Sequence, residues 1–207
     1  HATFHTIGYY YPNCWMQDFR CYKGLDKYKE PFTPSTISIR DYERNVTTFD
    51  DSFPSSLALP LWNSTGTINE VNVEDISENK LTVTQGSVKL TWDTNVTKWY
   101  DGSVLFPDDI NANLSVQSSD VLAFGSGDFT IEAWCYFTKT SESDIFSTDD
   151  YNTYNSTSGL FAFRKSANET LSFYCNNGFD SVSEGLTGDT ISQNTWGHCA
   201  VTRQNGV

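Results

Sequence analysis

The chain has 207 residues, of which 38% are hydrophobic and 15% aromatic, and this excludes an intrinsically disordered chain because such chains are poor in aromatic residues. The 26 acidic residues outnumber the 13 basic ones, so the formal net charge is −13, and nucleic acid or an anionic membrane surface would be repelled. No run of apolar residues is long enough to span a bilayer, so we expect no membrane insertion.

Residues 1–50 read as an irregular, aromatic-rich N-terminal arm or as the end of a preceding module. Their aromatic residues stand among turn residues, and Pro31 and Pro34 disfavour regular structure. The chain opens at His1 rather than at Met, so either a leader was removed or the chain begins inside a longer polypeptide.

From residue 51 onward, hydrophobic and polar residues alternate in short runs, as they do in strands. The expected strands lie at residues 57–61, 71–73, 81–83, 88–92, 103–106, 114–116, 129–138, 160–164, 171–175 and 198–203. Many short strands separated by turn residues predict an all-β sandwich or barrel. No segment favours a helix longer than about two turns.

The clearest strand covers residues 129–138, where the alternation is uninterrupted. Side chains two residues apart lie on one face of a strand. The face expected in the core carries Phe129, Ile131, Ala133, Cys135 and Phe137, and the other carries Thr130, Glu132, Trp134 and Tyr136.

The end of the chain carries a hairpin signal. Asn205 and Gly206 follow an alternating apolar run, and Asn-Gly is the strongest short-range predictor of a hairpin turn. No partner strand follows, so we expect that the chain ends inside its domain or that another chain supplies the missing strand.

The five cysteines do not describe a closed disulfide framework, because their number is odd. Cys135 and Cys199 stand inside apolar strand patterns and are expected to be reduced core residues. Cys14 and Cys21 could pair with each other locally, and their spacing leaves this open.

Two segments carry a family likeness. Residues 124–134, Phe-Gly-Ser-Gly-Asp-Phe-Thr-Ile-Glu-Ala-Trp, and residues 195–203, Thr-Trp-Gly-His-Cys-Ala-Val-Thr-Arg, together resemble a laminin-G-like, concanavalin-A-like jelly-roll domain. Residues 57–60 resemble its opening strand, and residues 100–106 resemble its Gly-x-Ser-Leu-x-Phe segment. The resemblance covers residues 51–207 and implies an antiparallel jelly-roll sandwich whose C-terminal strands are missing.

The amino-acid sequences of these motifs are most similar to those of domains in phage and marine microbial surface proteins. The resemblance therefore implies a non-enzymatic, structural and adhesive module of a virion-surface assembly such as a tail fibre, an appendage or a capsid decoration. The alternative is a secreted lectin-like or adhesion protein that is N-glycosylated and calcium-dependent. Six sequons would serve that alternative, at Asn45, Asn63, Asn95, Asn113, Asn155 and Asn168.

Glu132, Trp134 and Tyr136 are the candidate glycan-binding residues. Aromatic faces stack on sugars, and a carboxylate accepts hydrogen bonds from sugar hydroxyls. The competing interpretation is that Trp134 packs under a loop or the arm. The glycoside hydrolases of this fold carry Glu-x-Asp-x-x-Glu on one strand, and this spacing is missing, so we expect no catalytic residues.

Asp144, Asp149 and Asp150 are the candidate metal ligands, because calcium takes carboxylate oxygens from loops. Asp108 with Asp109 is a rival pair, and a solvated acidic loop is the competing interpretation. Apart from this calcium, no cofactor is expected.

Aromatic residues of the expected arm are candidates for contact with other subunits of an oligomeric assembly, because aromatic side chains dominate interface cores. They are Tyr9, Tyr10, Tyr11, Trp15 and Phe19. The competing interpretation is that they cover the sheet of their own domain.

Overall fold

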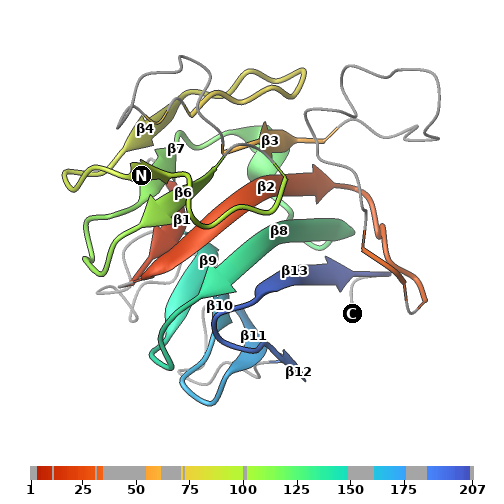
Figure 1. Ribbon diagram of the computed structural model, residues 1–207. Helices are drawn as coiled ribbons and strands as arrows, with labels where there is room; N and C mark the ends of the chain where they lie inside the picture. Colours follow the sequence, from red (N-terminus) through yellow and green to blue (C-terminus); the bar gives the residue numbers. More distant parts are fainter. Residues whose placement is uncertain are drawn as a thin grey trace.

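The computed structural model describes residues 4–10, 12–30, 32–34, 55–61, 71, 73–99, 102–148, 161–175 and 186–205. These residues form two antiparallel β-sheets that pack face to face, which confirms the predicted all-β, jelly-roll-like sandwich (Figure 1). Alternating side chains make this packing possible, because one face of each sheet can be apolar while the other remains polar.

The first sheet has seven strands. In spatial order they are β12 (Leu186–Thr190), β11 (Thr170–Cys175), β10 (Phe161–Lys165), β9 (Ser143–Thr148), β1 (His5–Tyr9), β7 (Leu114–Val116) and β4 (Val83–Gln85).

The second sheet has six strands, and β2, β8 and β13 lie side by side within it (Figure 1). In spatial order they are β13 (Trp196–Arg203), β8 (Phe129–Phe137), β2 (Cys14–Lys23), β6 (Ser103–Phe106) and β5 (Thr91–Asp93), and β3 (Leu57–Leu59) pairs with β2 beside β6.

The expectation of an irregular N-terminal arm is wrong for β1 and β2. β1 lies between β9 and β7, and β2 lies between β8 and β6. Both strands therefore belong to the same sandwich as the strands that follow residue 51. Strand pairing satisfies their backbone N–H and C=O groups, which an arm would leave to water. Residues 35–50 lie outside the described part of the chain.

A bulge explains why the pattern of β2 does not read as a strand. The pairing of β2 with β8 shifts register between Gln17 and Arg20, and Asp18 within the shift has a φ of 52°. As a result Met16 and Phe19, three residues apart, are both fully buried. A bulge inserts one extra residue and so breaks the two-residue alternation.

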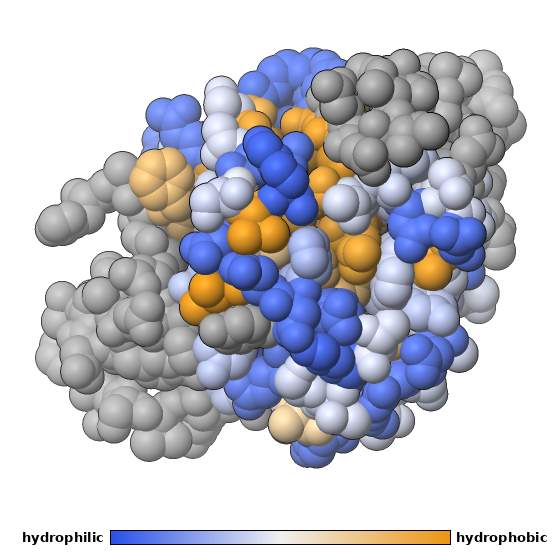
Figure 2. Space-filling view, turned by 60° about the vertical axis from the view of Figure 1, so that its left-hand side comes forward, coloured by the Kyte–Doolittle hydropathy of each residue, from blue (hydrophilic) through white to orange (hydrophobic). Residues whose placement is uncertain are grey.

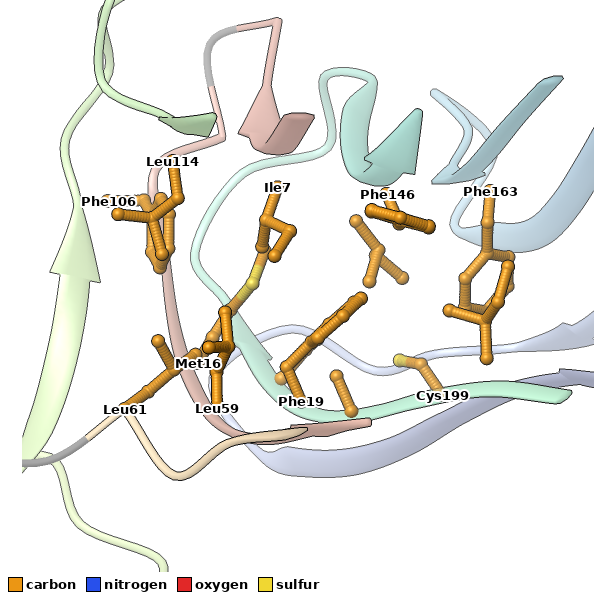
Figure 3. Close-up of a cluster of buried hydrophobic side chains, with 14 of the residues drawn as sticks. Ile7, Met16, Phe19, Leu59, Leu61, Phe106, Leu114, Phe146, Phe163 and Cys199 are labelled. Carbon is orange, nitrogen blue, oxygen red and sulfur yellow. The ribbon is translucent and has the colours of Figure 1, made fainter. Parts of the chain in front are cut away.

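The core lies between the two sheets, and its side chains come from both (Figure 3). Ile7, Leu114 and Phe146 of the seven-stranded sheet point towards Met16 and Phe19 of the other. The inward face of β8 is confirmed: Phe129, Ile131, Ala133, Cys135 and Phe137 are at most 2% exposed.

Cys14, Cys21, Cys135 and Cys199 are free thiols. Cys135 and Cys199 are fully buried, as expected. The idea of a local bond between Cys14 and Cys21 is wrong, because both lie on the extended strand β2. Seven residues of strand separate their Cα atoms by about 23 Å, whereas a disulfide requires roughly 4.4–6.8 Å.

Helical structure is limited to one short 3-10 segment within the described residues, at Asp120–Leu122. This agrees with the absence of any helical pattern in the sequence. Among these residues, none belongs to a helix long and apolar enough to cross a membrane. Among the described strands β13 lies at the end of its sheet, and the expectation of a further strand after Asn205 stays a prediction.

Replacing Phe19 tests the placement of β2. We expect Phe19→Ala to lower the free energy of unfolding by about 3–5 kcal/mol, because it leaves a cavity in a packed core. Urea denaturation would measure this loss. Phe4, which is 45% exposed, provides the control, and Phe4→Ala should change stability little. A Phe19→Ala protein as stable as the control would contradict the burial of β2.

Candidate functional site

The outer face of the six-stranded sheet carries a row of aromatic side chains. Trp15, Tyr136 and Trp196 are paired in register across β2, β8 and β13, so they occupy neighbouring positions on three adjacent strands. All three are half-buried. We call them the aromatic row.

Edge contacts hold the aromatic row in place. The ring centroids of Trp15 and Tyr136 are 5.5 Å apart at 87°, and those of Tyr136 and Trp196 are 5.8 Å apart at 63°. The indole Nε1 of Trp15 donates a hydrogen bond of 2.9 Å to Asp93 Oδ2 on β5. The row therefore has fixed side-chain orientations, and part of each ring remains open to solvent.

Trp134, two residues from Tyr136 on the same face, is covered by a loop. Its indole meets that of Trp99 at a centroid distance of 5.8 Å, and Lys98 Nζ lies 3.9 Å from its ring centroid. Gln17 anchors the loop, because its Oε1 accepts hydrogen bonds of 3.1 Å from the backbone N–H groups of Lys98 and Trp99. Of the two interpretations of Trp134, packing beneath a loop is therefore the one the structure shows.

Glu132 lies at the centre of a buried polar cluster. Its Oε1 accepts hydrogen bonds from Lys27 Nζ at 2.7 Å and from Tyr22 Oη at 3.3 Å. Its Oε2 accepts one from Tyr28 and lies 3.2 Å from His198 Nε2. Arg20 approaches Oε1 at 4.0 Å. Two neighbouring strands and the segment after β2 thus meet at one carboxylate.

Burial alone would raise the pKa of Glu132. The hydrogen bond from His198 and the charges of Lys27 and Arg20 outweigh this effect and hold that pKa well below its usual range. Glu132 is therefore ionised, 3% exposed and already surrounded by donors. The prediction that it offers an open carboxylate to sugar hydroxyls is wrong.

The segment after β2, residues 24–30 and 32–34, folds across the outer face beside this cluster, and we call it the strap. Lys27 N donates to Thr130 Oγ1 at 3.0 Å, and this hydroxyl donates to Leu25 O at 2.9 Å. The strap and β13 line an open pocket of about 390 Å³. Its lining residues are Tyr28, Lys29, Glu30, Phe32, Ala200 and Thr202.

The two sequence motifs that carried the family likeness meet in the structure. Residues 124–134 form the turn before β8 and the first part of β8, and residues 195–203 contain β13. Arg203 joins them, because its guanidinium donates to Gly127 O at 2.8 Å and to Gly125 O at 2.7 Å.

Residues 109–207 match the family model of the concanavalin A-like lectin/glucanases superfamily. This part of the chain is therefore similar to that superfamily. Searches among curated proteins and among solved structures gave no significant match. The likeness of residues 51–108 therefore depends on the sequence motifs quoted above.

The candidate calcium ligands of this lectin/glucanase-like domain are not gathered at a loop rim in the described residues. Asp144 is 1% exposed on β9 and forms an ion pair with Arg164, whose Nε lies 2.9 Å from Asp144 Oδ1. Asp149 and Asp150 lie outside the described residues, so their part of the prediction stays open. Within the described ranges no group of three metal-binding side chains is found.

The rival acidic pair is also engaged in local contacts. Asp108 pairs with Lys139, and Asp109 Oδ1 accepts a hydrogen bond of 2.8 Å from Asn111 N. Local contacts alone thus account for the positions of both carboxylates.

The candidate interface residues fall into different environments. Phe19 is fully buried, with its ring centroid 5.1 Å from that of Phe146, so the prediction that it anchors a neighbouring subunit is wrong. Tyr9, Tyr10 and Trp15 are half-buried, and an interface role for them stays a prediction. Tyr11 lies outside the described residues.

Sequence reasoning missed two contributors to this face. Trp196 was left out because the strand was expected to begin at residue 198, although Trp196 lies an even number of residues from His198 and so shares its face. Phe32 lies in an irregular segment, where periodicity gives no signal.

The pH dependence of stability tests the Glu132 cluster. Folding lowers the pKa of Glu132 below its ordinary value of 4.5, so its stabilisation is present above that pH and is lost as the pH falls. We expect Glu132→Gln to destabilise the domain by about 3–5 kcal/mol at pH 7, because it removes the anion that Lys27 and Arg20 face in a largely buried cluster. Urea denaturation between pH 3 and 7 should show the two proteins converging towards low pH.

The difference in stability between the wild type and Glu132→Gln separates the effect of Glu132 from that of a second buried carboxyl group, Asp144. Burial raises the pKa of Asp144 to about 6, although the charge of Arg164 opposes this, so its effect on stability has the opposite sign. That effect is the same in both proteins and cancels in their difference. Glu74 is exposed, and Glu74→Gln is the control. A constant difference across this pH range would contradict the assignment.

Proposed function

We propose that the domain is a non-catalytic glycan-binding and adhesion module, and that the aromatic row is where it binds glycan. The observation that carries this proposal is the alignment of Trp15, Tyr136 and Trp196 on three adjacent strands. Neighbouring strands lie about 4.8 Å apart, so the outer two rings are separated by about 10 Å. Partly exposed aromatic rings with fixed orientations offer stacking surfaces to successive sugar rings.

One face of the molecule has a surface of mixed polar and apolar character. In the view of Figure 2, orange hydrophobic residues are interrupted by blue hydrophilic ones. Large continuous apolar patches mark protein or membrane contacts, and glycans instead need aromatic faces placed among hydrogen-bonding groups.

The state of Glu132 supports a function without catalysis. The acid of a glycosidase needs a raised pKa so that it can protonate the leaving group, and the pKa of Glu132 is lowered. Its oxygens are also occupied by Lys27, Tyr28 and His198. In this position Glu132 acts as a structural anion.

For the location of the module we propose the surface of a virion assembly, in contact with neighbouring subunits. The similarity of the motifs to phage and marine microbial surface proteins supports this. The alternative is a secreted lectin-like protein. Of its six sequons, Asn95 and Asn168 are exposed in the described residues.

A glycan array followed by calorimetry tests the aromatic row. We expect Trp196→Ala to weaken binding of the strongest array ligand about tenfold or more, the effect of losing roughly 1.4 kcal/mol of stacking. Tyr136→Ala should act similarly, whereas Tyr136→Phe should bind like the wild type. Tyr174, half-buried on β11 of the other sheet, supplies the control Tyr174→Ala. Absence of binding to any glycan, or equal binding by all variants, would refute the proposal.

Removing calcium distinguishes metal-independent glycan binding at the aromatic row from a calcium-dependent lectin. Stacking on the aromatic row requires no metal, so we expect the affinity for the array ligand to be unchanged in EDTA. Loss of binding in EDTA, restored by calcium, would favour the calcium-dependent lectin instead.

A further inference from the structure

We propose that the strap pocket is a second sugar subsite on the same face, so that the domain prefers linear oligosaccharides over disaccharides. This inference rests on the proposed glycan-binding function. It assigns a ligand class to the pocket between the strap and β13, whose volume of about 390 Å³ accommodates a sugar ring.

The aromatic row and the pocket lie along one strand. Trp196, His198, Ala200 and Thr202 alternate on the outer face of β13, since Trp196 is paired with Tyr136 and Thr202 with Thr130. Trp196 ends the aromatic row, while Ala200 and Thr202 line the pocket. Four residues of strand place Ala200 about 13 Å from Trp196, a distance that several linked sugar rings can cover.

Phe32 gives the pocket an exposed aromatic surface. It is 41% exposed, and Phe4 is the other large hydrophobic side chain found exposed in the described residues. Its ring stacks on Tyr28 at a centroid distance of 3.5 Å and meets the edge of His198 at 5.6 Å. Tyr28 is held in turn by Glu132. The ring of Phe32 is therefore held in place by Tyr28 and His198, although Phe32 lies in an irregular segment.

Polar groups stand at the rim of the pocket. Lys29 and Glu30 are exposed, and Lys29 Nζ lies 3.4 Å from Asp26 Oδ2. The Thr202 hydroxyl shares a hydrogen bond of 2.9 Å with Thr130. An aromatic ring beside an ammonium, a carboxylate and a hydroxyl matches the alternating C–H faces and hydroxyl edges of a sugar.

The size of Ala200 keeps the pocket open. Ala200 faces outward opposite Glu132 in the register of β13 and β8. A larger side chain at this position would extend into the pocket. Ala200→Ile therefore closes the subsite with a residue that strands favour, and it leaves the aromatic row unchanged.

Calorimetry with size-graded oligosaccharides tests the subsite. The probes are cello-, laminari- and manno-oligosaccharides of two to six units, together with the length series of the strongest array ligand. We expect affinity to rise about tenfold from the disaccharide to the longer members, the contribution of about one added aromatic contact. Phe32→Ala and Ala200→Ile should remove this rise and leave the disaccharide affinity unchanged.

Two further variants serve as references. Phe4→Ala removes an equally exposed phenylalanine near β1 and should retain the full rise with length. Trp196→Ala should weaken binding at every length. Thermal melting of each variant verifies folding, and the unchanged disaccharide affinity shows that the aromatic row remains intact.

The outcomes separate the two proposals. Affinity that does not rise with length, or a rise that survives both Phe32→Ala and Ala200→Ile, would overturn the subsite and leave the aromatic row in place. Failure of every probe and every array glycan to bind would overturn the subsite together with the proposed function.

Discussion

Pairing of β8 on both of its edges is the constraint on which the structure depends. With β2 on one side and β13 on the other, each side chain of β8 must face either the core or the outer surface. Phe129, Ile131 and Phe137 fill the core as a result. The same alternation buries the carboxylate of Glu132 on the outer face. A buried charge is costly unless it is compensated, so this carboxylate requires donors from β2, β13 and the strap. The strap is thus held in place because it supplies donors to the buried carboxylate of Glu132.

The fold could be predicted wherever alternation is regular, and it was missed where a register shift interrupts it. The expected strand at residues 103–106 has the observed bounds, and that at 129–138 differs by one residue. The sequence does not predict β2 as a strand, because its bulge buries both Met16 and Phe19, which are three residues apart. The sequence does not predict β9 for a related reason. Its pairing with β10 is irregular, so the adjacent Ile145 and Phe146 are both buried and the alternation is lost.

The candidate site was harder to predict, because its contacts join residues distant in sequence. The outward direction of Glu132, Trp134 and Tyr136 followed from periodicity, whereas their exposure depends on what covers them. Lys27 contacts Glu132 across 105 positions, and no local pattern encodes such a contact. Once the register of β8 and β13 is known, the placement of Trp196 beside Tyr136 follows directly.

The position of β2 also sets an order of events during synthesis. This strand is made before all of its neighbours in the sheet, which are β3, β6 and β8, and the last of these ends at Phe137. Contacts between such distant segments must await the later partner, and they slow folding. A nascent chain therefore carries the hydrophobic residues of β2 without a complete sheet until the residues of β8 have left the ribosome. In that interval its unpaired edges are open to chaperones or to other nascent chains.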